Sequence, residues 1–332
     1  MQTNKPTVAV TGGSGFVGNA LVRHLAGLGY PVRVLNRDPG KFAPVEGVDV
    51  VTGDLADPEA LKRLTAGADT VYHIASMFRT EGAADEFDEI NYKGTMNLFA
   101  AAEAAGVRRF VHCSTIGVHG NVMHTPADET SPFNPRDPYQ DSKLKAELAV
   151  RAAAQDLKMQ LVVIRPCSTY GPGDVRLLKI FRMVQKGVFF FVGSGKPNIH
   201  PVYIDDLVRG YVLAMTTPAA AGEVFIIGQQ SYLPLREFIN AAARSLGAKQ
   251  PWIRIPYGPM NALARVCEIV FPKIGMQPPL HRRRLTFYKH NRAFSIEKAR
   301  RLLGYEQQIS LDEGFRRTVD WYYETGLLSR KG

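Results

Sequence analysis

The stretch "VAVTGGSGFVGNALVRHL", residues 8–25, places four glycines between a short apolar run and an apolar helical pattern. The run reads as a buried strand, and the segment 16–28 reads as the helix that follows it. Gly12 permits a tight turn, Gly15 lets the backbone approach a pyrophosphate, and Gly18 lets the helix pack close to the strand. The free N–H groups of the helix start would face the phosphates. The stretch therefore predicts a dinucleotide-binding strand–turn–helix unit.

The same alternation continues through the first half of the chain. Apolar runs read as strands at 7–10, 31–35, 70–75, 108–114 and 160–166, and helical patterns occupy 58–66, 86–105, 138–155 and 175–187. This predicts an α/β fold with a Rossmann-type, doubly wound parallel sheet. We expect a dinucleotide-binding domain over residues 1–170, completed by about 201–228, and a smaller C-terminal substrate-binding lobe over 171–200 and 229–332.

The composition is that of an ordinary globular protein of 332 residues, with no apolar run of membrane-spanning length and no signal-peptide pattern. The three cysteines, Cys113, Cys167 and Cys267, are far apart and form no CxxC motif. This predicts a reducing, cytoplasmic location and neither a metal site nor a disulfide framework.

The chain is basic, with a net charge of +10, and its densest basic stretch is "HRRRLTFYKHNR" at 281–292. Such a charge indicates an anionic partner or simply a solvated basic surface. No nucleic-acid motif accompanies it, so we expect no nucleic-acid partner. The residues 282–292 leave open a diphosphate or a membrane surface as the partner.

The second strand ends in "VLNRDPGK", where an acid would bind the two ribose hydroxyls of NAD. Asn36 and Arg37 stand there, with Lys41 nearby, and a guanidinium suits a 2′-phosphate. The pattern favours NADP over NAD, although NAD stays an alternative. Asp54, after the strand-like "DVVTGD", would accept a hydrogen bond from the adenine amino group or else begin the next helix.

The segment "PYQDSK" places Tyr139 and Lys143 four residues apart, on one face of a helix that Pro138 begins. An ammonium group beside a phenol favours the phenolate, so we expect Lys143 to lower the pKa of Tyr139 toward the working pH. The tyrosine would then exchange a proton with a substrate oxygen while hydride is transferred.

With these motifs the chain resembles the extended short-chain dehydrogenase/reductase family, of the NAD-dependent epimerase/dehydratase type. The matching segments run along most of the chain: "TGGSGFVG", "GDL", "HIAS", "NYKGT", "STIGVHG", "PYQDSK", "RPCSTYGPGD", "HPVYIDDLV" and "FSIEKARRLLGY". Within the family the chain is most similar to the branch of 3β-hydroxysteroid dehydrogenases and dihydroflavonol reductases.

The resemblance implies roles for further residues. Thr115, with its neighbour Ser114 as the alternative, would hydrogen-bond the reacting oxygen, Tyr139 would be the acid/base, and Lys143 would hold the nicotinamide ribose. Asn91 would fix the central strands. The remaining cofactor-contacting candidates are Phe16, Val17, Leu55, Ala75, Ser76, Pro166 and Cys167.

Two departures from the motifs of nucleotide-sugar members bear on the substrate. Nucleotide-sugar members often carry an Asn in "NxYGP" and an Arg before "YVDD"; here Ser168 and the segment 199–201 replace them. The sequence therefore favours a small-molecule alcohol or ketone of cyclic or extended apolar shape, beneath an apolar helix near 260–271. The alternatives are a nucleotide-sugar epimerase or dehydratase with a tightly bound, recycled NAD(P), and a non-enzymatic protein on the same fold. The resemblance also implies a homodimer formed through the helices 86–105 and 138–155.

Overall fold

The fold is seen in a computed structural model that describes residues 5–38, 40, 42–78 and 84–330. Within these ranges the side chains of Arg283, Arg284 and Thr286 are not described.

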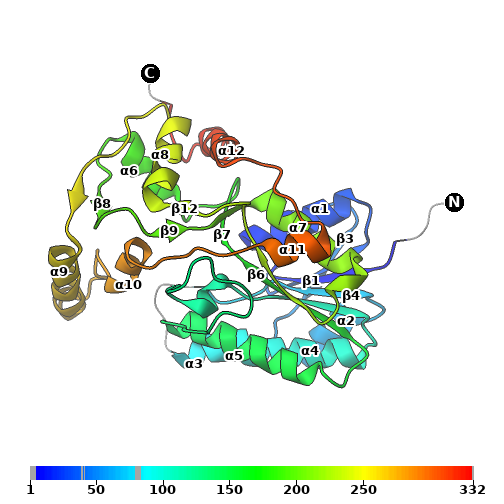
Figure 1. Ribbon diagram of the computed structural model, residues 1–332. Coiled ribbons are helices and arrows are strands. Elements are labelled where there is room, and N and C mark those ends of the chain that lie inside the picture. The colour runs from blue at the N-terminus through cyan, green and yellow to red at the C-terminus, as the bar shows by residue number, and fades with distance from the viewer. Residues whose placement is uncertain (1–4, 39, 41, 79–83, 331–332) are drawn as a thin grey trace.

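A seven-stranded parallel sheet forms the centre of the protein (Figure 1). Its strands lie in the order β11-β6-β5-β4-β1-β2-β3. Their bounds are β1 Val8–Thr11, β2 Val32–Asn36, β3 Val48–Thr52, β4 Thr70–His73, β5 Arg109–Cys113, β6 Gln160–Pro166 and β11 Val224–Ile227. All six neighbouring pairs are parallel, which confirms the predicted doubly wound α/β fold.

Helices cover both faces of the sheet, as the strand side chains require. The helices α2 (Pro58–Thr65), α4 (Gly94–Ala104) and α5 (Pro138–Ala153) pack together on one face, whereas α1 (Phe16–Gly27) and α7 (Ile204–Thr216) cover the other (Figure 1). Along β1, Val8 and Val10 belong to one buried cluster and Ala9 to another. Because side chains alternate across a strand, each strand contributes to both layers of core.

The predicted helix 86–105 is interrupted. It consists of α3 (Ala84–Phe87), a π-helical turn at Asp88–Lys93, and then α4. Asn91 lies in the turn, is fully buried, and bonds the backbone of Met77 through both halves of its amide. An extra residue per turn re-aims a side chain, and here the wider turn carries the Asn91 amide.

The C-terminal part of the chain lies mostly outside the sheet. Its elements are β7 (Ser168–Tyr170), α6 (Leu178–Gln185), β8 (Phe191–Val192), β9 (Asn198–Ile199), β10 (Pro201–Tyr203), β12 (Leu233–Pro234), α8 (Leu235–Ser245), β13 (Arg254–Ile255), α9 (Tyr257–Val270), α10 (Arg282–Leu285), α11 (Glu297–Leu303) and α12 (Leu311–Glu324). The strands pair as β10-β7, β12-β9 and β13-β8. One buried cluster continues from the sheet into α6, α8 and α12, so the two predicted units share a core, and their boundaries stay a prediction.

Candidate active site

The glycine loop between β1 and α1 has the shape that close approach of a phosphate requires. Gly12 has a φ of +76°, and a Cβ there would meet the Ala75 backbone nitrogen at 2.6 Å. A Cβ on Gly18 would overlap the carbonyl oxygen of Gly12. Gly15 is the N-cap of α1, and within residues 12–27, all described, no side chain caps the helix start and its first turn has no acid. The helix start with Phe16 and Val17 is thus free to bind an anion.

The residues predicted for the adenosine end lie at the ends of β2 and β3. Asn36 is buried and donates a hydrogen bond to the Asp38 carbonyl at 2.9 Å, and Arg37 beside it is exposed. Lys41 lies outside the described residues. Asp54 is exposed, and one carboxylate oxygen accepts from the Ala56 N–H at 2.8 Å.

The loop after Asp54 also shows whether Asp54 begins the next helix, which was one of the two roles predicted for it. The N-cap of α2 is Asp57, whose side chain accepts from the Ala60 N–H, so Asp54 is not the capping acid of that helix. Leu55 follows it half-buried, against α4. The contact of Asp54 with an adenine stays a prediction.

The end of β4 supplies the other wall of the predicted cofactor groove. The Ala75 N–H donates to the Thr11 hydroxyl at 3.3 Å, which places Ala75 next to the glycine loop, and Ser76 is exposed beyond it. Pro166 ends β6, and Cys167 follows with its N–H bonded to the Ile227 carbonyl at 2.9 Å. Burial raises the pKa of the Cys167 thiol, which is therefore protonated and unreactive at neutral pH.

The structure brings two of the three predicted catalytic groups into contact. Asp137 caps the start of α5 by accepting from the Gln140 N–H at 3.0 Å, and Pro138 occupies its first turn. This sets Tyr139 in the first turn of the helix, where its phenol lies beside the hydroxyl of Thr115. Thr115 follows β5 and also accepts from the Gly117 N–H.

Lys143 lies one helical turn further along α5 and is only 1% exposed. Burial lowers its pKa, while nearby Cys113 and Glu147 raise it in part. The expected lowering of the Tyr139 pKa is wrong for this arrangement. Burial raises that pKa above its ordinary value, and the charge of Arg176 and the Thr115 hydroxyl only partly oppose the rise. The physical reason is that burial favours the neutral phenol more than the neighbouring groups favour the phenolate.

Two buried histidines that the sequence did not single out lie near Lys143. His73 and His112 are register partners on β4 and β5, with ring centroids 5.6 Å apart. Burial, followed by the charge of Lys143, lowers the pKa of His73 to about 3 and that of His112 in the same direction. Both rings are therefore neutral, and they add no positive charge near Lys143.

Two side-chain networks hold α5 in place, and three of their members, Ser142, Glu147 and Arg165, were not singled out from the sequence. The Asn91 amide donates to the Ser142 hydroxyl at 2.9 Å, and Ser142 donates to the Tyr139 carbonyl at 2.9 Å. Directly after β5, Ser114 donates to the Glu147 carboxylate at 2.6 Å, and Arg165 of β6 bonds the same carboxylate. Ser114 thus serves this network, and Thr115 is the hydroxyl at the tyrosine. Glu147 could have been found from its position eight residues after Tyr139, which places both residues on the same face of the predicted helix.

The position that would hold a diphosphate-binding arginine is filled by an apolar side chain. Ile199 lies on β9, is 3% exposed and pairs with Leu233 of β12. His200 beside it is buried, with its Nε2 bonded to the Gln229 carbonyl at 2.7 Å. The ring of Phe78 packs edge-on against Tyr139 at 4.9 Å and remains 58% exposed.

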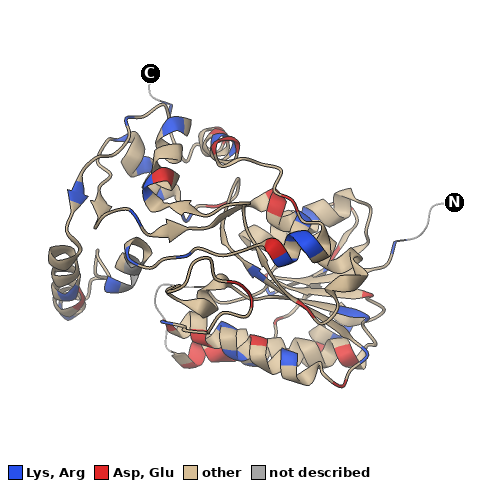
Figure 2. Cartoon of the chain, in the orientation of Figure 1, with Lys and Arg blue, Asp and Glu red and all other residues tan. Residues whose placement is uncertain are grey.

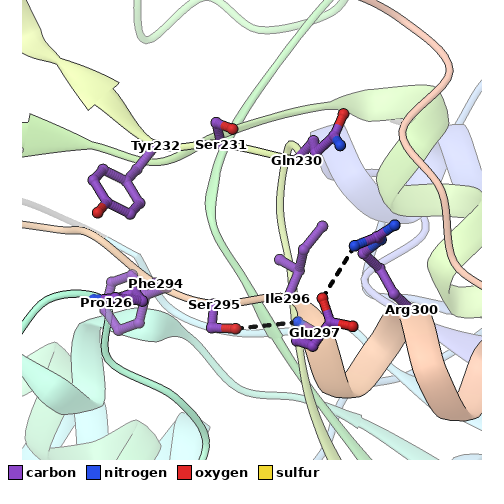
Figure 3. Close-up of a pocket in the computed structure, with 9 residues that line it drawn as sticks. All are labelled: Pro126, Gln230, Ser231, Tyr232, Phe294, Ser295, Ile296, Glu297 and Arg300. Atoms are coloured by element: carbon purple, nitrogen blue, oxygen red, sulfur yellow. Dashed lines mark hydrogen bonds and ion pairs between the residues drawn. The ribbon is translucent and has the colours of Figure 1, made fainter.

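A separate pocket of about 360 Å³ lies between the segments around Tyr232 and Phe294 and the start of α11 (Figure 3). Ser295 accepts from the Glu297 N–H at its floor, and Glu297 pairs with Arg300. No predicted site residue lines it. Within the described parts of the chain, no group of His, Cys, Asp and Glu is arranged to hold a metal ion, and no helix is long and apolar enough to cross a membrane.

Comparisons with known proteins agree with this geometry. The profile of the NAD dependent epimerase/dehydratase family matches residues 8–228. A 2-alkyl-3-oxoalkanoate reductase of Stenotrophomonas maltophilia is 33% identical, over 93% of this chain and 97% of that protein. A 3-beta-hydroxysteroid dehydrogenase of Mycolicibacterium neoaurum is 32% identical, over 97% of this chain and 93% of that protein.

Solved structures give the same fold. The crystal structure of gox2253 has a TM-score of 0.82 at 27% identity, covering 98% of this chain and all of that one. The dTDP-glucose 4,6-dehydratase DesIV of Streptomyces venezuelae, solved with NAD and TYD bound, has a TM-score of 0.77 at 29% identity, covering 97% and 99%.

Proposed function

Because this chain belongs to the NAD-dependent epimerase/dehydratase family of extended short-chain dehydrogenases/reductases and is an enzyme of the oxidoreductase type, we propose that it transfers hydride between a nicotinamide and an apolar secondary alcohol or ketone. The observation that carries the proposal is the contact between the Thr115 and Tyr139 hydroxyls at the carboxyl end of β5, with the apolar ring of Phe78 against the tyrosine.

The nicotinamide supplies the hydride in reduction and accepts it in oxidation. In reduction the Tyr139 hydroxyl gives its proton to the carbonyl oxygen, and the Thr115 hydroxyl donates a hydrogen bond to that oxygen. The raised pKa of Tyr139 keeps the phenol protonated near neutral pH, which is the form that reduction requires. The buried ammonium of Lys143 then stabilises the phenolate left behind and binds the nicotinamide ribose.

An apolar substrate is supported by what the site lacks as well as by what it holds. With Ile199 buried at the position of the diphosphate-binding arginine, a nucleotide-sugar diphosphate would lose a bidentate, charge-assisted contact there. The exposed ring of Phe78 beside Tyr139 offers an apolar surface to a substrate at that point. The relatives named for 2-alkyl-3-oxoalkanoates and for 3-beta-hydroxysteroids support the same substrate class.

We further propose NADP(H) as the preferred cofactor. The family is NAD-dependent by description, and the glycine loop with Gly12 and Gly15 fits a dinucleotide pyrophosphate. The exposed guanidinium of Arg37 at the end of β2 suits a 2′-phosphate. A homodimer through α4 and α5 and a cytoplasmic location complete the proposal.

The test is turnover of NADPH and NADH by the purified protein with a 2-alkyl-3-oxoalkanoate and a 3-oxosteroid. We expect NADPH consumption that Tyr139→Phe lowers by a factor on the order of 10²–10⁴, because the proton donor is lost. Tyr30→Phe, which removes a phenol beside Lys5 at the opposite end of the sheet, is the matched control and should leave the rate unchanged. Equal rates for both variants would contradict the assignment.

The second candidate is a nucleotide-sugar epimerase or dehydratase, favoured by the likeness to DesIV at 29% identity. It predicts cofactor that remains bound through purification and heat of binding for free UDP or dTDP. A flat calorimetric titration with both nucleotides, together with carbonyl reduction, would exclude it.

A further inference from the structure

The helix α9 has a second apolar face that nothing in the described chain covers. Its inner residues Met260 and Ala264 pack with Val192 and Leu285. A different stripe faces outward, formed by Pro259, Ala262, Leu263, Val266, Ile269 and Val270, all of them exposed. At 3.6 residues per turn these positions cover a sector of about 120° with no charged residue in it. Figure 1 places α9 at the edge of the molecule, far from α1.

The exposed apolar residues are concentrated in this region. Sixteen large apolar side chains are exposed in the described residues, and eight of them fall between Trp252 and Met276. Leu263, Val266 and Ile269 are each exposed by more than half. Single exposed apolar residues need no explanation, but a contiguous patch marks a surface that docks on something.

The surroundings of the patch are positively charged. Residues 249–292 contain nine Lys and Arg and a single acid, Glu268, so they carry +8 of the net +10 of the chain. Glu268 is paired with Arg282 at 2.7 Å. Arg265 flanks the apolar sector and Lys273 follows it, both exposed. Figure 2 shows a mostly uncharged α9, with Lys and Arg on the segments that lead into and out of it.

We propose that α9 and the following residues 271–276 form a docking surface for an anionic phospholipid membrane. Aliphatic side chains on one helix face bury themselves at the boundary between headgroups and acyl chains, and flanking Lys and Arg contact anionic headgroups. A nucleic acid would match the charge but would leave the aliphatic face in water. A protein partner would need a rigid surface with acids placed to match these cations, whereas anionic lipids adapt to any arrangement of cations.

The inference concerns a surface and needs no turnover, so its test is independent of the proposed reaction. Purified protein is sedimented with vesicles of phosphatidylcholine alone and with an equal mixture of phosphatidylcholine and phosphatidylglycerol. We expect binding to the mixed vesicles, much weaker binding to phosphatidylcholine, and loss of binding as salt is raised. Trp252, 82% exposed at the entrance to α9, gives a fluorescence readout in parallel.

Two variants and one control separate the contribution of the apolar face from that of the charge. Leu263→Asp on α9 should weaken binding to the mixed vesicles by about tenfold or more, since burying a leucine contributes at least that factor. Leu28→Asp, an exposed leucine after α1, should leave binding unchanged. Arg265→Glu with Lys273→Glu should abolish the preference for phosphatidylglycerol.

Three results would overturn the proposal. One is absence of binding to mixed vesicles at low salt. Another is equal binding by Leu263→Asp and Leu28→Asp, which would show that the apolar face is not used. The third is a wild-type oligomer in sedimentation that Leu263→Asp alone dissociates, which would assign the face to a second copy of the chain.

Discussion

Replacing Glu147 with Gln is expected to destabilise the fold by about 3–5 kcal/mol, because it leaves a buried guanidinium without its counter-charge. Glu147 and Arg165 are both fully shielded from solvent. The Glu147 carboxylate accepts hydrogen bonds from Arg165 Nε at 3.0 Å and from the Ser114 hydroxyl at 2.6 Å. Arg165 keeps its contacts to His119 and to the Glu129 carbonyl in the variant, but neither supplies a negative charge.

Thermal and denaturant unfolding measure the effect. For 332 residues the entropy of unfolding is about 0.7 kcal/mol per kelvin, so the loss lowers Tm by about 4–7 °C. The control is Arg151→Gln, which removes a 44% exposed arginine 3.5 Å from the same carboxylate. Because that pair is exposed on one side, its loss should cost about 0.5 kcal/mol or less.

The pH dependence gives an independent check on the sign. Burial alone raises the pKa of Glu147, but the hydrogen bonds and charge of Arg165 and the Ser114 hydroxyl bring it below its ordinary value of 4.5. A carboxyl with a depressed folded-state pKa stabilises the fold above its ordinary pKa and loses that contribution as the pH falls through the folded pKa. The difference between wild type and Glu147→Gln should be constant near neutral pH and shrink below about pH 4.5. Equal melting of Glu147→Gln and Arg151→Gln at pH 7 would refute the reasoning.

Three further predictions concern the proposed cofactor site and Lys143. Arg37→Asp should shift the kcat/KM preference from NADPH toward NADH, because it removes the phosphate contact and adds repulsion; Arg23→Asp on α1 is the control, and an unchanged preference would refute the assignment. Lys143→Met should lower kcat and raise the KM for the cofactor. Its Tm should stay near that of wild type, because the change replaces a buried charge by an apolar chain. A large loss of Tm with normal kcat would assign Lys143 to stability alone. Gly18→Ala should destabilise the fold by about 1–3 kcal/mol and abolish dinucleotide binding in calorimetry, because its Cβ would overlap the Gly12 carbonyl oxygen. The control is Gly27→Ala, which should be tolerated because the added Cβ would enter open space.

The sheet and the glycine loop could be predicted because their determinants are local. A buried parallel strand must be apolar on both faces, so β1, β2, β4, β5 and β6 appear directly in the sequence as short apolar runs. Gly12 adopts the positive φ of the turn after β1, and Gly18 lies six residues further on, against the Gly12 carbonyl oxygen. The Thr115–Tyr139 contact followed from the family resemblance rather than from spacing, because the two residues lie on different elements.

What could not be predicted depends on contacts between distant segments or on burial. In the π-helical turn at 88–93, Asn91 bonds the Met77 backbone and Ser142 at once, and neither partner is visible from the local pattern. The pKa of Tyr139 was predicted in the wrong direction because the i, i+4 spacing reveals a neighbouring charge but not the degree of burial. The exposure of the outer face of α9 could not be predicted either, because the sequence of an apolar helix does not show whether another segment covers it.

One face of α5 carries both the proposed catalytic residues and a residue that stabilises the fold. Tyr139, Lys143 and Glu147 recur every four residues, so they project from the same side of the helix toward β5. Glu147 fixes that side to Ser114, the residue directly before Thr115, and Asn91 fixes the first turn through Ser142. The Thr115 and Tyr139 hydroxyls are therefore held together from two sides by groups that would touch neither substrate nor cofactor. A variant that loosens either anchor should lower kcat more than it raises the KM of the substrate, because it disturbs the geometry of proton transfer rather than the binding surface.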